Sequence, residues 1–176
     1  MKRKSAALPA PAFPSPAFPP HAHDHAHCID DALLAADRIC AGRGARLTEL
    51  RRHVLAILWR SHEPIGAYDV LERLARETRR RAAPPTVYRA LEFLLGQGLI
   101  HRVESRNAFI GCTRPDMNHA VEILMCTACG RAAEVPDSRI ARAVRNSAAT
   151  FGFEVQRQTI EVSGVCADCR TGDRRG

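Results

Sequence analysis

The sequence predicts an α+β protein in two parts, a helical N-terminal part and a small mixed part that follows it. Three observations support this division. Apolar residues recur at helical spacing over residues 30–98, whereas beyond residue 99 they follow the pattern of short strands. Basic charge is concentrated in the first part, because residues 43–89 hold eleven arginines against five acidic residues. Two Cys-x-x-Cys pairs lie in the second part.

The composition fits a folded protein that stays in the cytoplasm. Of its 176 residues, 45% are apolar, which is enough to form a core. No run approaches the roughly 18 apolar residues that span a membrane, so no membrane association is expected. Prolines interrupt the segment after the basic start at Met1–Lys4, so a signal-peptide core is missing. In the cytoplasm, the seven cysteines are better explained as metal ligands or thiols than as disulfides.

Residues 1–29 are predicted to form a flexible arm rich in proline and histidine. Such a low-complexity segment cannot bury enough apolar surface to fold alone. Histidines alternate with other residues near its end, and they could either capture zinc or belong to a solvated tail, which is the interpretation we favour. The candidate zinc-capturing residues are His21, His23, His25, His27 and Cys28.

Four helices with short connections are expected in the first part. Their predicted ranges are 31–40, 48–60, 66–78 and 84–96. Thr48 suits the N-cap of the second helix, and Pro84 and Pro85 suit the first turn of the fourth, which Gly96 and Gly98 end. The residues expected to face the core of the last three helices are Leu50, Val54, Ile57, Leu58, Val70, Leu71, Leu74, Val87, Ala90, Leu91 and Leu94.

A hairpin follows the fourth helix. Two short strands, Leu99–Glu104 and Ala108–Cys112, flank the polar turn at residues 105–107. Helices followed by such a hairpin, or wing, make a winged helix-turn-helix. We therefore expect residues 30–113 to form a winged-helix DNA-binding domain, followed by a hinge over residues 114–118. The concentrated positive charge agrees with a surface that binds phosphate.

The second part is predicted to be a compact α/β domain over residues 119–170, followed by a tail over residues 171–176. Its expected elements are strands 120–126 and 131–135, a helix over 137–151 that Gly152 stops, and a strand over 153–165. A module of about sixty residues holds too small a core to be stable without an additional cross-link.

The cysteine pairs supply that cross-link if they bind one metal ion together. Cys126 and Cys129 are separated from Cys166 and Cys169 by 36 residues. Each pair lies at a strand end, and two such pairs can surround one Zn²⁺ tetrahedrally. Redox dithiols or unligated core cysteines are the alternatives. We expect a structural zinc site that contributes directly to folding of the second part.

The chain resembles the Fur superfamily of metal-dependent transcriptional regulators, most closely its zinc-uptake-regulator branch, Zur. The resemblance covers residues 30–170. It depends on the segments Pro84–Leu91 and Gly98–Ser105 and on the two Cys-x-x-Cys pairs in this order. It implies a homodimer in which residues 119–170 form the dimerisation domain, and a regulatory metal site distinct from the four-cysteine site.

The resemblance also implies the ligands of the regulatory site. They are His101, Cys112, His119 and Glu134, with Asp116 as an alternative to His119. One thiolate, two imidazoles and one carboxylate suit Zn²⁺. We therefore expect one structural and one regulatory Zn²⁺ per chain. Because ligands would come from both domains, zinc would fix the angle between them and couple metal binding to DNA binding.

Contacts with double-stranded DNA are expected from the fourth helix. Arg89 could bond a guanine, and Tyr88 could pack on a thymine methyl or bond a phosphate, with Thr86 beside them. A two-fold dimer should read an inverted repeat. The candidate phosphate contacts are Arg51, Arg52, Arg79, Arg80 and Arg81.

These features predict a zinc-responsive repressor and not an enzyme, and the resemblance implies that it controls zinc-uptake genes. One alternative is an iron or peroxide sensor of the same superfamily, which the thiolate of Cys112 disfavours. A zinc enzyme would use the same regulatory ligands with Glu134 as a general base, but no substrate pocket is evident. A zinc buffer or metallochaperone would leave the basic helical part unexplained.

Overall fold

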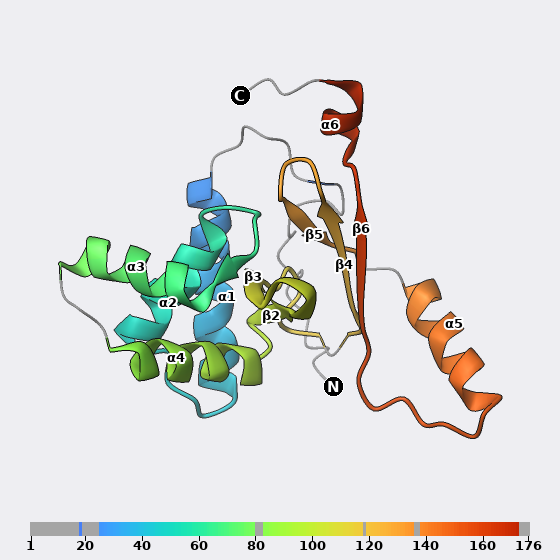
Figure 1. Cartoon of the computed structure of the whole chain (residues 1–176). Coiled ribbons are helices and arrows are strands. Elements are labelled where there is room, and N and C mark those ends of the chain that lie inside the picture. Colours follow the sequence, from blue (N-terminus) through green and yellow to red (C-terminus); the bar gives the residue numbers. More distant parts are fainter. Residues whose placement is uncertain (1–17, 19–24, 80–82, 118, 136–137, 173–176) are drawn as a thin grey trace, which may run out of the picture.

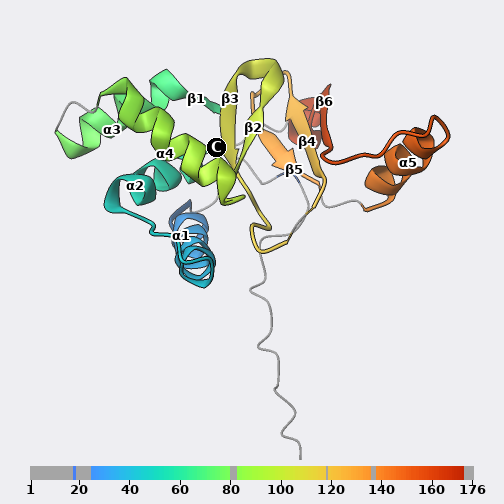
Figure 2. The same ribbon diagram turned by 90° about the horizontal axis from the view of Figure 1, so that it is seen from below.

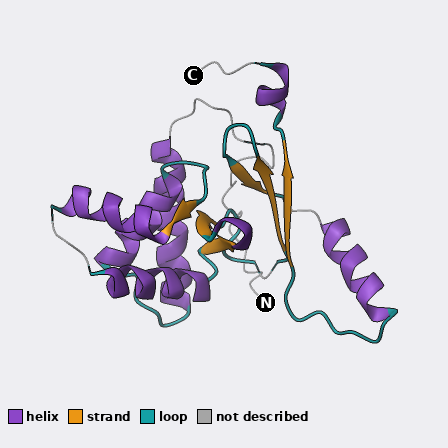
Figure 3. Cartoon of the chain, viewed as in Figure 1, coloured by secondary structure: helices purple, strands orange, loops and turns teal. Residues whose placement is uncertain are grey.

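The computed structural model describes residues 18, 25–79, 83–117, 119–135 and 138–172. The predictions for Arg80, Arg81 and most of the N-terminal arm lie outside the described residues. Most of the helices gather at one end of the molecule, the strands lie beside them, and one helix stands at the opposite end (Figure 3). None of the described helices has both the length and the apolar character needed to cross a membrane.

Four helices build the N-terminal part, and three of them match their predicted ranges. They are α1 (His25–Gly42), α2 (Glu49–Trp59), α3 (Ala67–Thr78) and α4 (Pro84–Gly96). The prediction for α1 was wrong at its start, because the helix begins six residues before residue 31. Its buried stripe continues backwards through Ala32 to Cys28, so packing holds this turn in the helix. Residues 25–29, which we assigned to the arm, are therefore helical.

The N-terminal part has a large core. Nineteen buried residues from α1 to α4 and the adjoining strands form one cluster among the described residues. The residues predicted to face this core do so, although Leu50 and Leu71 are only partly buried. The four helices pack around it in Figure 1.

The wing forms as predicted, with one added strand. Strands β2 (Ile100–Val103) and β3 (Ala108–Gly111) pair antiparallel around the short 3₁₀ helix η1 (Glu104–Arg106). Strand β1 (Ile65–Gly66) pairs with β3 on its other edge, giving the order β1-β3-β2. Two residues are too short to leave a periodic pattern, so β1 was not predicted.

The second part is a three-stranded sheet of order β5-β4-β6. Strand β4 (Val121–Cys126) pairs antiparallel with β5 (Ala132–Glu134) and parallel with β6 (Thr159–Gly164). Helix α5 (Ser138–Ala149) lies in the connection between β5 and β6, and it stands away from the sheet in Figures 1 and 2.

Two details of this part differ from the predictions. Strand β6 begins at Thr159 rather than at residue 153, because Thr159 pairs with Val121, the first residue of β4, and earlier residues meet no strand. Helix α6 (Ala167–Thr171) forms over the second cysteine pair, where no helix was expected.

The two parts meet along a small apolar junction. Val103 and Ile110 of the wing pack with Ile123, Met125 and Ala132 of the second sheet. Figure 2 shows β2 and β3 beside β4 and β5. The functional side chains described next lie on both sides of this junction.

Candidate metal centres and DNA-facing surface

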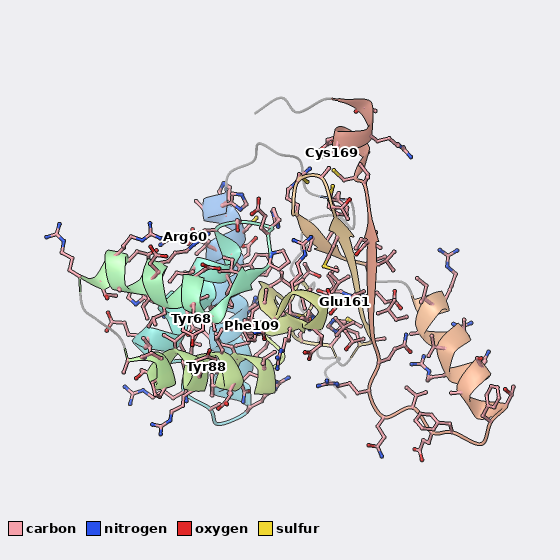
Figure 4. All side chains as sticks on the ribbon, viewed as in Figure 1. Arg60, Tyr68, Tyr88, Phe109, Glu161 and Cys169 are labelled. Carbon is pink, nitrogen blue, oxygen red and sulfur yellow. The ribbon has the colours of Figure 1, made fainter. Side chains whose placement is uncertain are left out.

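The four predicted cysteines come together at one end of the second sheet. Each of the four sulfur atoms lies within 4.8 Å of the others, and the Sγ atoms of Cys129 and Cys166 are 3.9 Å apart. Sulfur atoms bound to one tetrahedral Zn²⁺ lie about 3.8 Å apart, given a Zn–S bond of about 2.3 Å. Cys126 ends β4 and Cys169 lies in α6 (Figure 4). The donor set and its spacing fit a structural Zn²⁺.

Backbone N–H groups favour the thiolate form at this centre. The N–H of Cys166 donates to Sγ of Cys126 over 3.3 Å. Burial opposes ionisation of Cys126, but N–H groups of Cys166, Cys129 and Ala128 outweigh it and lower the pKa of Cys126 to about 6. A metal at this site would therefore meet a sulfur that already favours the ligating form.

A buried arginine, which sequence reasoning missed, supports the same centre. Nε of Arg131 donates to Sγ of Cys129 over 3.4 Å, and Nη2 lies 3.6 Å from Sγ of Cys166 and 3.0 Å from Oδ2 of Asp168. Four thiolates around Zn²⁺ carry a net charge of −2, so this guanidinium offsets part of a buried negative charge. An arginine two residues after Cys129 is too common a feature for this role to be identified from the sequence.

The second centre lies across the junction between the two parts. His101 lies in β2 and Cys112 directly follows β3, whereas His119 precedes β4 and Glu134 ends β5. One ligand atom from each residue lies within 4.8 Å of the others. Asp116, the alternative to His119, is exposed and does not belong to this group. The structure thus brings together the four residues that the family resemblance implied.

Two distances in this second centre match a tetrahedral site, whereas Nε2 of His119 and Oε1 of Glu134 lie closer together than two ligands of one ion would. Nε2 of His101 lies 3.3 Å from Oε1 of Glu134, and Sγ of Cys112 lies 3.8 Å from Nε2 of His119. Ligand atoms around Zn²⁺ are separated by about 3.3–3.7 Å at bond lengths of about 2.0–2.3 Å. His101 Nε2 is buried without a hydrogen bond of good geometry among the described residues, as expected for a nitrogen that binds a metal.

Neighbouring groups orient the ligands. Nδ1–H of His119 donates to the carbonyl of Met117 over 2.8 Å, which turns Nε2 towards Glu134. Oε2 of Glu134 accepts hydrogen bonds from the backbone N–H of Thr113 over 2.8 Å and from its hydroxyl over 2.7 Å, leaving Oε1 to face the histidines. Thr113 was not predicted, because no sequence pattern marks such a supporting role.

The pKa values of the two acidic ligands shift in opposite directions, although burial opposes the ionisation of both. Burial, and then the charge of Glu134, raise the pKa of the Cys112 thiol well above its usual range. Burial would also raise the pKa of Glu134, but His101, His119 and Thr113 outweigh it and hold that pKa below its usual range. A metal must therefore displace the proton of Cys112, so metal affinity should fall as the pH falls.

The predicted DNA-reading residues are exposed on α4. Thr86, Tyr88 and Arg89 lie in its first turns, and 42% of Tyr88 is exposed. Tyr68, at the start of α3, is 73% exposed and lies near Tyr88 (Figure 4). Partial burial and a hydrogen bond with Tyr68 raise the pKa of Tyr88. Sequence reasoning overlooked Tyr68, although an exposed tyrosine on the helix before α4 is a usable signal.

Two predicted phosphate contacts are engaged by their own chain. Arg51 lies over the ring of Phe93, 3.4 Å from its centre, and donates to the carbonyl of Arg46. Arg52 forms an ion pair with Asp37 at 2.6 Å. A phosphate would have to share these cations, so both assignments stay predictions.

The chain is similar in sequence to known proteins. Residues 42–163 match the family model described as the ferric uptake regulator family. The chain is 40% identical over 140 residues to the zinc uptake regulation protein of Escherichia coli, covering 79% of this chain and 81% of that protein. It is 29% identical over 134 residues to the zinc uptake regulation protein of Mycobacterium tuberculosis, covering 73% and 97%.

Two solved structures share the fold. A zinc uptake regulator complexed with zinc and DNA superposes with a TM-score of 0.76 at 38% identity, covering 84% of this chain and 98% of the other. Holo XcZur superposes with a TM-score of 0.73 at 40% identity, covering 81% and 99%. The chain therefore belongs to the ferric uptake regulator family.

Proposed function

We propose that the chain is a zinc-responsive transcriptional repressor that acts in the cytoplasm. It binds operator DNA as a zinc-loaded homodimer and controls zinc-uptake genes. The observation that carries this proposal is the convergence of His101, Cys112, His119 and Glu134 from both parts of the chain. Two relatives named as zinc uptake regulators, and a related structure that holds both zinc and DNA, support it.

The donor set favours zinc over iron. Cys112 supplies a soft thiolate, and His101 and His119 supply imidazoles, a combination that suits four-coordinate Zn²⁺. An iron site would use nitrogen and oxygen ligands in larger number. The iron-sensing alternative therefore loses its support at this centre.

Coupling follows from where the ligands lie. His101 and Cys112 are fixed to the wing, and His119 and Glu134 are fixed to the second sheet. Side chains that gather around one ion hold the wing against that sheet more firmly than the small apolar junction alone. The closed arrangement is then more populated when zinc is present, which is the requirement for an allosteric switch.

The closed arrangement fixes the DNA-reading helix relative to the second part. In a two-fold dimer, the second parts would join and the two copies of α4 would be held at a set distance, suited to an inverted repeat. Apolar side chains on the second part are exposed in the single chain, as expected for a surface that a partner copy covers. They include Ile140, Phe151, Phe153, Val162 and Val165.

Cys112→Ser tests the proposal. The change replaces the thiolate ligand with a hydroxyl and leaves the four-cysteine centre intact. We expect a folded dimer that keeps its tightly held zinc but loses the zinc-dependent rise in operator affinity. A coupling of about 1–3 kcal/mol is typical, so the loss should be about 5- to 150-fold. A zinc-buffered DNA titration with metal analysis measures it.

Cys40→Ser is the matched control. Cys40 is equally buried, at 2% exposed, but lies in α1 outside the metal-binding groups of the described residues. It should respond to zinc as the unchanged protein does. If Cys112→Ser also responds normally, the sensor lies elsewhere and the regulatory assignment is wrong. Repeating the titration with iron and manganese distinguishes a zinc sensor from other family members.

A further inference from the structure

A third group of metal-binding side chains lies at the start of α1. His25 and Cys28 are three residues apart, so both project from one face of the helix. His62, from the loop between α2 and β1, reaches the same place. One ligand atom from each lies within 4.8 Å of the others, and the two imidazole rings have centres 5.0 Å apart.

The chemistry of this group suits a metal ion. Two imidazoles and one thiol are the donors found at zinc sites with three protein ligands, where water completes the tetrahedron. Cys28 is 8% exposed and both histidines are half-buried, so the donors are sheltered but remain reachable from solvent. Small side-chain rotations would bring the three atoms to the spacing of about 3.3–3.7 Å that Zn²⁺ requires.

We propose that His25, Cys28 and His62 form a third zinc site, separate from the four-cysteine centre and from the regulatory centre. With three protein ligands and one open position, it holds zinc more loosely than the four-cysteine centre. His25 and Cys28 also precede residue 42, where the match to the family model begins. The family model therefore does not include these two ligands.

The position of His62 connects this site to the second part. The carbonyl of His62 accepts a hydrogen bond from the N–H of Ala132 in β5 over 2.7 Å. The adjacent Glu63 faces Gly130, which follows the first cysteine pair, with Cδ of Glu63 3.6 Å from where a Cβ of residue 130 would lie. Fixing His62 to α1 therefore also fixes a loop that contacts the second sheet.

A consequence for DNA binding rests on the proposed function. Zinc bound by His25, Cys28 and His62 adds a second connection between the two parts, through the contact of His62 with Ala132. Operator affinity should then rise further when zinc exceeds the amount that fills the regulatory centre. Metal binding at the third site itself does not depend on that function.

Zinc counting on the full-length dimer tests the site. The protein is titrated with Zn²⁺ in competition with a weak chelator, and bound zinc per chain is measured at saturation. The unchanged protein should bind three ions, the weakest of which the chelator removes first. Cys28→Ser and His62→Gln should each bind two ions.

His27→Gln is the matched control, because His27 is exposed and lies beside the site without belonging to it. It should keep three ions. His62→Gln is tested beside Cys28→Ser because Cys28 lies in the core, where a substitution could disturb folding, whereas His62 lies in a loop. A saturated count of two in the unchanged protein, or of three in both variants, overturns the proposal. In Cys112→Ser the chelator should still remove this weakly held ion. That result does not depend on whether the regulatory assignment is correct, so the third site and the proposed function can fail separately.

Discussion

The two parts of the chain are stabilised by different means. The N-terminal part buries nineteen described residues in one cluster. Among its described residues, the second part contributes only Ile123, Met125 and Ala132 to a buried cluster, and that cluster is completed by Val103 and Ile110 of the wing. Its helix α5 leaves Ile140 exposed, and Phe151 follows it at 85% exposed. We therefore expect the first part to fold on its apolar core and the second to depend on metal and on neighbouring surfaces.

Loss of the four-cysteine centre should have the largest effect and should be confined to the second part. Cys129→Ser leaves three thiolates and removes binding energy that reaches about 10 kcal/mol or more at structural zinc sites. We expect monomer or aggregate in sedimentation, with the helical content of the first part retained in circular dichroism. A stable, fully dimeric Cys129→Ser protein with one zinc fewer would show that the second part does not depend on the four-cysteine centre.

Overpacking the core of the first part should lower the free energy of unfolding by less than loss of the four-cysteine centre does. A Cβ at residue 111 would lie 2.3 Å from Cε2 of Trp59, so Gly111→Ala must displace a buried ring. Such overpacking costs about 1–3 kcal/mol. Denaturant unfolding followed by Trp59 fluorescence measures it, because this is the single tryptophan of the chain.

Gly96→Ala provides the control for that change. Nothing lies within 4 Å of the added Cβ, and Gly96 ends α4 without a left-handed conformation. Alanine should leave stability unchanged or raise it by up to about 1 kcal/mol. Equal losses from Gly96→Ala and Gly111→Ala would contradict the contact with Trp59.

Recognition of individual bases should depend on side chains of the first part. Arg89→Ala should cost about 1–3 kcal/mol at one guanine of each half-site, whereas Arg80→Ala should weaken binding to all sequences alike and flatten the salt dependence. Binding to operator and to single-base variants, at several salt concentrations, measures both effects. An unchanged specificity ratio in Arg89→Ala would make Arg89 a phosphate contact.

The smallest effect is expected at a contact that joins the two parts. Glu161 of β6 accepts hydrogen bonds from backbone N–H groups of Glu104 over 2.6 Å and Ser105 over 3.2 Å (Figure 4). Burial opposes this charge, but the side chain of Ser105 and these N–H groups outweigh it and lower the pKa of Glu161. Glu161→Gln should therefore cost on the order of 1 kcal/mol or less at pH 7, because the site is partly exposed.

The pH dependence of that effect has a definite sign. A carboxyl group with a lowered folded pKa stabilises the protein above its unfolded pKa of about 4.3, and this contribution disappears as the pH falls through the folded value. The difference between unchanged protein and Glu161→Gln should thus shrink below about pH 4 in denaturant unfolding. Glu154→Gln, on the exposed segment before β6, should show no such difference at either pH.

The sequence alone determined the local elements and the strongest metal centre. Helix α4 follows from Pro84, Pro85 and the spacing of its buried residues, because helix start signals and periodicity act within a few turns. The four cysteines follow from their spacing, since each pair needs only a tight turn to bring two sulfurs together. The regulatory residues came from family resemblance, and the structure brings them together across the junction.

Only the tertiary structure decided the contacts between distant segments. The early start of α1 depends on burial of Cys28 against other helices, and the late start of β6 depends on where β4 begins. Arg131 lies 37 residues before its partner Asp168, and His62 lies 34 residues after Cys28. Such contacts leave no periodic trace in the chain, because packing free energy and not local conformational preference brings them together.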